Sequence, residues 1–199
     1  MYGLPISTER KQQLPKKAIY AKFDLKTSQR DSFDADIARI DIVAVVSPAT
    51  VPALGEGTKV KEFYVLDVQM KRREYDAKNI LLLTRLIAQH MVFALRDEDQ
   101  VQFAIFHTKL FTTAWRPVEQ ATLPLSGLNL DVVWENMVKH IGQIEVAGEN
   151  SLATQIAEDD QRAKLLAQIA TLERKMANEK QPRRKRGYFE QIKKLKEQI

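Results

Sequence analysis

The first half of the chain contains two runs of β-branched and aromatic residues that predict β-strands. The run IDIVAVVS, residues 40–47, ends at the turn-forming sequence SPATVPAL. The run EFYVLDVQMK, residues 62–71, follows the loop GEGTK. A short helix is expected in the sequence SQRDSFDADIARI, which leads into the first strand, with Ser28 or Asp31 as its N-cap.

A longer helix is predicted in the sequence DAKNILLLTRLIAQHM, residues 76–91. Its apolar residues recur at the intervals of three and four that mark one face of a helix: Ile80, Leu83, Ile87 and Met91. The sequence VFALRDEDQVQFAIFH that follows predicts a β-hairpin with the polar turn RDEDQ, and LFTTAWRPV can supply one more strand.

A further helix is expected after Asn129, a residue type that favours the N-cap position. The apolar stripe of this helix consists of Leu130, Val133, Trp134, Met137 and Ile141. The whole order of elements, strand, strand, helix, strand, strand, predicts an α+β domain with packed helices and a mixed or antiparallel sheet. We place this domain at residues 31–148, after an N-terminal arm at residues 1–30.

Residues 149–199 follow a different pattern, with very few glycines and aromatic residues. Two apolar stripes repeat at intervals of 4, 3 and 4, first Leu165, Ile169, Leu172 and Met176, then Tyr188, Ile192, Leu195 and Ile199. This spacing is typical of a coiled coil or a helical hairpin. Because Pro182 interrupts a straight helix, we predict two helices, at about 152–179 and 183–199, which fold on each other, on the domain or on a partner.

Charge is distributed unevenly along the chain. The 199 residues carry a net charge of +5, from 31 basic and 26 acidic side chains. Residues 151–199 hold 12 basic and 7 acidic side chains, so the whole excess lies in the last quarter. Such an asymmetry bears on binding partners rather than on the fold.

Cysteine is absent, which excludes disulfides, cysteine nucleophiles and cysteine-ligated metal centres. No apolar run has the length of a signal-peptide core or of a bilayer-spanning helix, so we expect a cytoplasmic protein without a membrane partner. The three histidines, His90, His107 and His140, do not have the short spacing of a metal site. Neither a phosphate-binding glycine loop nor a G-x-S-x-G motif is present, and we expect no cofactor.

Several segments together resemble a bacterial family named domain of unknown function 4391. They are LPKKAIY, DADIARIDIVAVVSPATV, VKEFYVLDVQMK, LPLSGLNLDVVWENMVKHI and the tail LERKMANEKQPRRKRGYFEQIKKLKEQ. The resemblance covers the chain from about Leu14 onward. It implies a bacterial accessory protein encoded beside the helicases and methyltransferases of restriction-modification-like phage-defence systems, and it implies no particular reaction.

One short motif suggests an enzymatic alternative. In the strand of residues 62–71, Asp67, Gln69 and Lys71 share one face, and Gln-Met-Lys is similar to the E/Q-x-K element of PD-(D/E)XK nucleases. With Asp41 on the preceding strand, these residues could hold Mg²⁺ and orient an attacking water. Asp34 and Asp36 offer further carboxylates.

The competing interpretation is a structural strand. Three-residue matches of this kind are common, and Asp41 and Lys71 could form an ordinary cross-strand ion pair. Glutamine in place of glutamate also removes one charge from the Mg²⁺ site. We therefore expect no catalytic residues, with the nuclease site as the alternative.

The main interaction signal is the cluster of basic residues in KQPRRKRGYFEQIKK. We predict that it contacts DNA, RNA or a helicase or methyltransferase subunit, through Lys180, Arg183, Arg184, Lys185, Arg186, Lys193 and Lys194. The expected function is thus that of a non-catalytic accessory protein. A self-associating scaffold, a homodimer through the helix at 152–179, is the third possibility.

Overall fold

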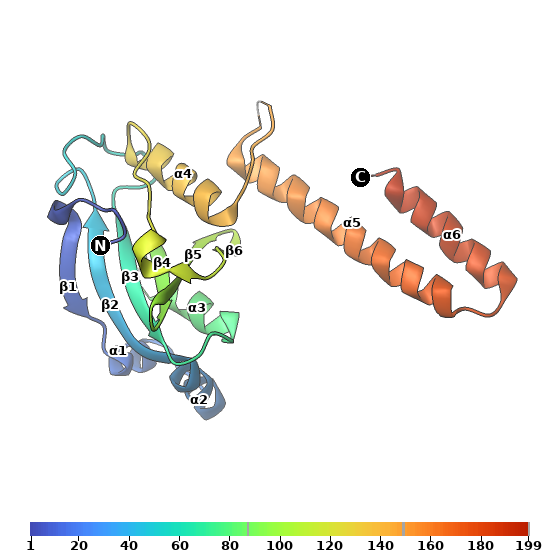
Figure 1. Cartoon of the computed structure of the whole chain (residues 1–199), viewed down its shortest axis with the longest axis horizontal. Coiled ribbons are helices and arrows are strands. Elements are labelled where there is room, and N and C mark those ends of the chain that lie inside the picture. The colour runs from blue at the N-terminus through green and yellow to red at the C-terminus, as the bar shows by residue number, and fades with distance from the viewer. Residues whose placement is uncertain (87, 149, 199) are drawn as a thin grey trace. The chain divides into compact units, whose positions relative to one another are not determined.

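The computed structural model describes residues 1–86, 88–148 and 150–198. The chain divides into two compact units, Met1–Ile144 and Glu145–Ile199 (Figure 1). The first unit is an α+β domain and the second consists of helices, as the sequence predicts. None of the helices in the described ranges has the length and apolar character needed to cross a membrane.

In the described residues, the first unit is built on a mixed, mostly antiparallel sheet. Its strands lie in the order β1-β2-β3-β4-β5-β6, and β7 pairs with β5. The bounds are β1 Glu9–Gln13, β2 Ile37–Val46, β3 Phe63–Met70, β4 His90–Asp97, β5 Gln100–His107, β6 Lys109–Thr112 and β7 Arg116–Pro117. Strands β3 and β4 pair in parallel and are joined by a helical crossover, whereas the other strand pairs of the described residues are antiparallel.

Helices cover both faces of this sheet. The helices are α1 Lys16–Lys22, α2 Thr27–Asp36, α3 Ala77–Leu83 and α4 Leu130–Gly142, with short 3-10 turns at Ile6–Thr8 and Val118–Gln120. Phe33 and Ile80, from α2 and α3, pack with Leu66 in the main core cluster. Trp134 of α4 packs against Phe63 on the opposite face of β3, with ring centroids 5.7 Å apart. Because both faces are covered, the central strands are apolar on both sides.

Several details of the sequence prediction are confirmed and others are wrong. The side chain of Asn129 accepts the backbone N–H of Val132 at 3.0 Å and caps α4 as expected. The N-cap of α2 is Lys26, so the assignments of Ser28 and Asp31 are incorrect.

The helix predicted at residues 76–91 is also too long. It ends at Leu83, and Met91 belongs to strand β4; Ile87 lies outside the described residues. Ile80 and Leu83 are fully buried as predicted. An apolar residue in a strand can continue the period of a preceding helix by coincidence, which explains the error.

The N-terminal residues 1–30 are part of the first unit. Strand β1 pairs with β2, and Tyr2 and Ile19 are buried. The ring of Tyr2 meets that of Phe103 edge to face at 5.3 Å. This segment therefore contributes to the packing of the sheet.

The second unit is a helical hairpin formed by α5, Leu152–Asn178, and α6, Pro182–Lys196. Of the three predicted arrangements, the structure shows the one in which the helices fold on each other. Ile169 and Ile192 are buried in this contact, while Leu172 and Leu195 of the same stripes are half-buried. Pro182 occupies the first turn of α6, where its missing N–H costs no helical hydrogen bond.

Candidate functional site

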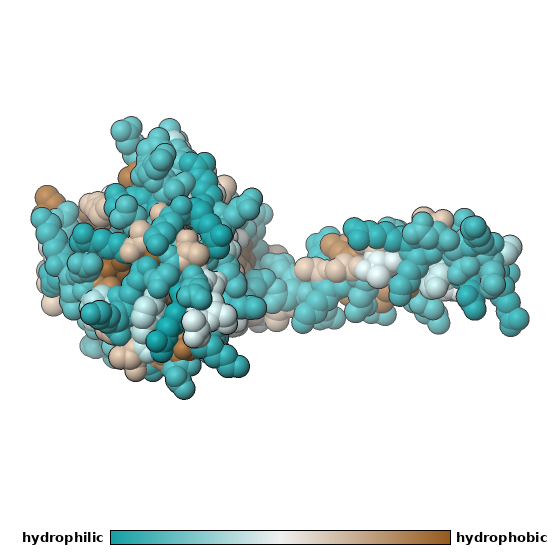
Figure 2. All heavy atoms as spheres, turned by 90° about the horizontal axis from the view of Figure 1, so that it is seen from below, coloured by the Kyte–Doolittle hydropathy of each residue, from teal (hydrophilic) through white to brown (hydrophobic). Residues whose placement is uncertain are grey.

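The basic residues of the second unit lie on the surface of the hairpin. Lys180 precedes α6, Arg183 to Arg186 follow Pro182 in its first two turns, and Lys193 and Lys194 lie in its last turns; all are exposed. Figure 2 shows a largely hydrophilic surface over this hairpin, interrupted by an apolar patch. Every predicted basic residue is thus accessible to solvent on the surface of the hairpin.

The helical period collects four of these side chains on one side of α6. Arg183, Arg186, Lys193 and Lys194 lie on the side opposite Ile192, which faces α5. From Arg183 to Lys194 this outer face extends about 16 Å along the helix axis. A cationic stripe of that length can contact several consecutive phosphates of a nucleic acid strand.

Few carboxylates offset this charge. Arg186 pairs with Glu190 at 3.3 Å, and both side chains are largely exposed. Arg183, Arg184 and Lys185 have no ion-pair partner among the described residues. The positive charge is therefore available to an external anion.

The position of the cluster adds an energetic argument. The first turn of a helix carries the positive end of the helix dipole, where basic side chains are unfavourable. Arg183, Arg184 and Lys185 lie in this turn of α6 and Arg186 follows it, and no acidic residue lies in the turn. An anion bound there would be attracted by both the side chains and the helix terminus, and would relieve their mutual repulsion.

Gly187 lies next to the cluster and weakens α6. No atom lies within 4 Å of the place where a Cβ would stand. Gly187→Ala is therefore expected to stabilise α6 by about 0.5–1 kcal/mol, because alanine loses less backbone entropy on helix formation. The check is hydrogen exchange of the α6 amides, which should slow by about two- to fivefold. Ala177→Gly, at an exposed position of α5, is the control and should speed exchange in its own helix.

The nuclease candidates lie in the first unit, on β2 and β3. Asp41 and Asp67 are direct cross-strand neighbours and line one pocket. Arg39 binds Asp41 with two hydrogen bonds, of 2.7 and 2.9 Å. Asp67 is only 3% exposed; it accepts the hydroxyl of Tyr2 at 3.0 Å and lies 3.3 Å from Arg96 Nε.

The other two nuclease candidates do not line this pocket. Gln69 lies opposite Arg39 in the β2–β3 pairing and is exposed. Lys71 follows the end of β3, where its backbone N–H donates to the carbonyl of Asp36 at 2.7 Å. Asp41 pairs with Arg39 rather than with Lys71. In the described ranges no group of three histidine or carboxylate side chains is arranged to hold a metal ion.

Sequence reasoning missed the residues that surround these two carboxylates. Tyr2 and Arg96 reach Asp67 from distant parts of the chain, and no local pattern marks them. Of these partners, Arg39 alone could have been found from the sequence. It stands two residues before Asp41 and so shares its strand face.

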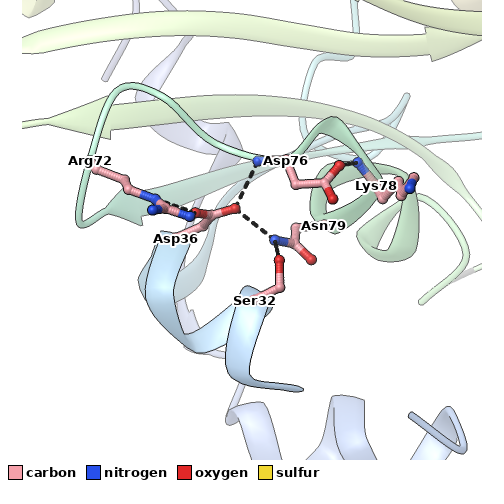
Figure 3. Close-up of polar contacts among 6 residues, drawn as sticks. All are labelled: Ser32, Asp36, Arg72, Asp76, Lys78 and Asn79. Carbon is pink, nitrogen blue, oxygen red and sulfur yellow. Dashed lines mark hydrogen bonds and ion pairs between the residues drawn. The ribbon is translucent and has the colours of Figure 1, made fainter. Parts of the chain in front are cut away.

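Asp36, one of the further carboxylates considered for metal binding, lies in a hydrogen-bond network that holds the fold together. It is fully buried at the end of α2 and accepts the backbone N–H of Asp76 at 2.8 Å and the side-chain amide of Asn79 at 2.7 Å. Arg72 donates to its other oxygen (Figure 3). Burial alone would raise the pKa of Asp36, but these three donors outweigh burial and lower it. Every carboxylate oxygen is engaged, so Asp36 ties α2 to the segment that begins α3.

The fold and its surface define an α+β protein that carries a cationic helical hairpin. The chain belongs to the family described as Domain of unknown function (DUF4391), whose model matches residues 2–199. A search of curated proteins found no match. A search of solved structures likewise found none.

Proposed function

We propose that the protein is a non-catalytic accessory factor that binds nucleic acid through the exposed basic residues of α6. The proposal is supported by one observation above all: the basic cluster of Arg183 to Arg186 is exposed and, apart from the Arg186–Glu190 pair, has no carboxylate partner in the described chain. Phosphate contacts by such side chains release counterions and do not require a particular base sequence.

The proposal includes the cellular system in which the protein acts. The resemblance stated above implies a bacterial, cytoplasmic role beside a helicase or methyltransferase of a restriction-like phage-defence system. In that setting, a basic hairpin would hold the complex on its nucleic acid while another subunit carries out the reaction. An acidic surface of the partner subunit could occupy the same cluster, and the experiment below separates the two cases.

The test is the affinity of the full chain for labelled duplex DNA, single-stranded DNA and RNA of equal length, measured by fluorescence anisotropy at several salt concentrations. Replacing Arg183, Arg184, Lys185 and Arg186 by glutamine should weaken binding at least about tenfold at physiological salt. The slope of log affinity against log salt for the duplex should become less negative by about 0.9 for each phosphate contact that is lost.

A matched control removes the same charge from the first unit. Lys17, Lys26, Lys59 and Lys78 are exposed and make no ion pair in the described structure, so their replacement by glutamine should leave the salt slope unchanged. Glu190→Gln should act in the opposite direction, because it removes the carboxylate that pairs with Arg186, and tighten binding several-fold. If the native chain bound no nucleic acid at low salt, or if both sets of variants bound equally well, the proposal would be wrong.

A further inference from the structure

The first unit contains a second cationic site, which the hairpin does not explain. It is a pocket of about 320 Å³ at the edge of the sheet formed by β1 to β4. Its charged lining side chains come from these four strands, and basic residues outnumber acidic ones. They are Arg10 and Lys11 on β1, Arg39 and Asp41 on β2, Asp67 on β3 and Arg96 on β4.

A bulge explains why two successive residues of β1 can line the same pocket. The β1–β2 pairing shifts register between Glu9 and Gln12, and Arg10 and Lys11 occupy this irregular segment. Bulges interrupt the strict alternation of a strand and re-aim its side chains. The edge strand is exposed along its whole length, so both side chains can meet a ligand.

The two carboxylates are already committed to arginines. Arg39 holds both oxygens of Asp41, and Arg96 and Tyr2 contact the two oxygens of Asp67. A cation would have to displace these partners, whereas an anion would not. The carboxylates instead fix the two guanidinium groups, whose side chains remain about 54% and 37% exposed.

The remaining charge favours an anion. Arg10 donates only to the carbonyl of Glu9, at 3.0 Å, and Lys11 has no ion-pair partner in the described chain. The Nε of Arg96 is buried and, despite its proximity to Asp67, makes no hydrogen bond. Because Arg96 Nε is ion-paired with Asp67 without a hydrogen bond, it can gain one when a ligand reorients the side chain.

We infer that this pocket binds a phosphate monoester. Arginine forks match the geometry of phosphate oxygens, and the two unneutralised cations of β1 balance the charge of a dianion. The volume is at the lower end of the range for small-molecule sites and suits a nucleotide or the phosphorylated end of a strand. This inference does not rest on the hairpin proposal, because all its residues belong to the first unit.

The experiment uses the full chain with Arg183 to Arg186 replaced by glutamine, so that the hairpin does not contribute. Adenosine monophosphate, inorganic phosphate and a short oligonucleotide with or without a 5′-phosphate serve as probes in calorimetric titrations. The phosphorylated probes should bind, and the double replacement Arg10→Gln and Lys11→Gln should weaken that binding about tenfold. Both residues are exposed on an edge strand, so folding should be unaffected, as circular dichroism would check.

Matched controls define the outcomes. The pair Lys17→Gln and Lys26→Gln removes the same charge from exposed positions away from the pocket and should not alter affinity. Arg39→Lys keeps the charge but loses the fork, and should weaken binding.

A preference for the phosphorylated oligonucleotide over the nucleotide would identify strand ends as the source; the reverse would identify a free nucleotide. Equal affinity for the oligonucleotide with and without its phosphate, no binding of any probe, or equal binding by the β1 variant would overturn the inference.

Discussion

Replacing Asp36 by alanine is expected to lower the free energy of unfolding of the first unit by about 2–4 kcal/mol, because it leaves two hydrogen-bond donors without their buried acceptor. The substitution removes the acceptor of the Asp76 N–H and of the Asn79 amide, and Asn79 is only 6% exposed. Water cannot readily replace that acceptor, so the unpaired donors carry their full desolvation cost. Arg72 loses its partner as well.

The measurement is urea unfolding followed by tryptophan fluorescence. Both tryptophans, Trp115 and Trp134, belong to the first unit, so the signal reports on that unit alone. Asp31→Ala is the control, because Asp31 is an exposed carboxylate on the same helix. Its effect should stay within about 0.5 kcal/mol. A loss of less than 1 kcal/mol for Asp36→Ala would contradict the structural role of this carboxylate.

The pH dependence gives a second readout for Asp36. Since the folded protein lowers the pKa of this group, its stabilising contribution is fully present above the unfolded pKa, about 3.9 for an aspartate. The contribution is lost as the pH falls below that value and through the folded pKa. The alanine variant should therefore lose less stability on acidification than the native protein does.

The sequence predicts those parts of the fold that depend on local patterns. Strands β2 and β3, the helix capped by Asn129 and the hairpin of α5 and α6 each have a run or stripe contained within one element. The sequence prediction places the end of α3 too late. Met91 fits the spacing of apolar residues that marks the helix, although it already belongs to strand β4. The spacing of apolar residues alone does not reveal where a helix ends and a strand begins.

The candidate sites divide in the same way. The basic cluster of α6 could be predicted because its residues are adjacent in sequence and a surface position needs no partner. The environments of Asp36 and Asp67 could not, because their partners lie far along the chain: Asn79 is 43 residues from Asp36, and Tyr2 is 65 residues from Asp67. An aspartate in a polar helix or in a strand with polar neighbours has the same local sequence whether it is exposed or buried.

Asp67 carries the last prediction, in which two substitutions are expected to differ. Asp67→Ala should cost about 2–4 kcal/mol, because it leaves the buried Tyr2 hydroxyl without its acceptor and removes the partner of Arg96. Asp67→Asn keeps an acceptor for Tyr2 and should cost less than about 1 kcal/mol near neutral pH. Tryptophan fluorescence in urea again measures both.

The dependence of stability on pH and on Mg²⁺ distinguishes a structural carboxylate at this position from a metal ligand of a nuclease. Burial raises the pKa of Asp67 despite the opposing effects of Arg96 and Tyr2. The folded state therefore binds this proton more tightly than the unfolded state, so the Asp67 contribution to stability falls as the pH rises from the unfolded pKa through the folded one. The asparagine variant should lack that fall, a trend opposite in sign to that of Asp36. Millimolar Mg²⁺ should stabilise neither protein, whereas a Mg²⁺-dependent gain present in the native chain and absent from Asp67→Asn would point to metal binding at this carboxylate.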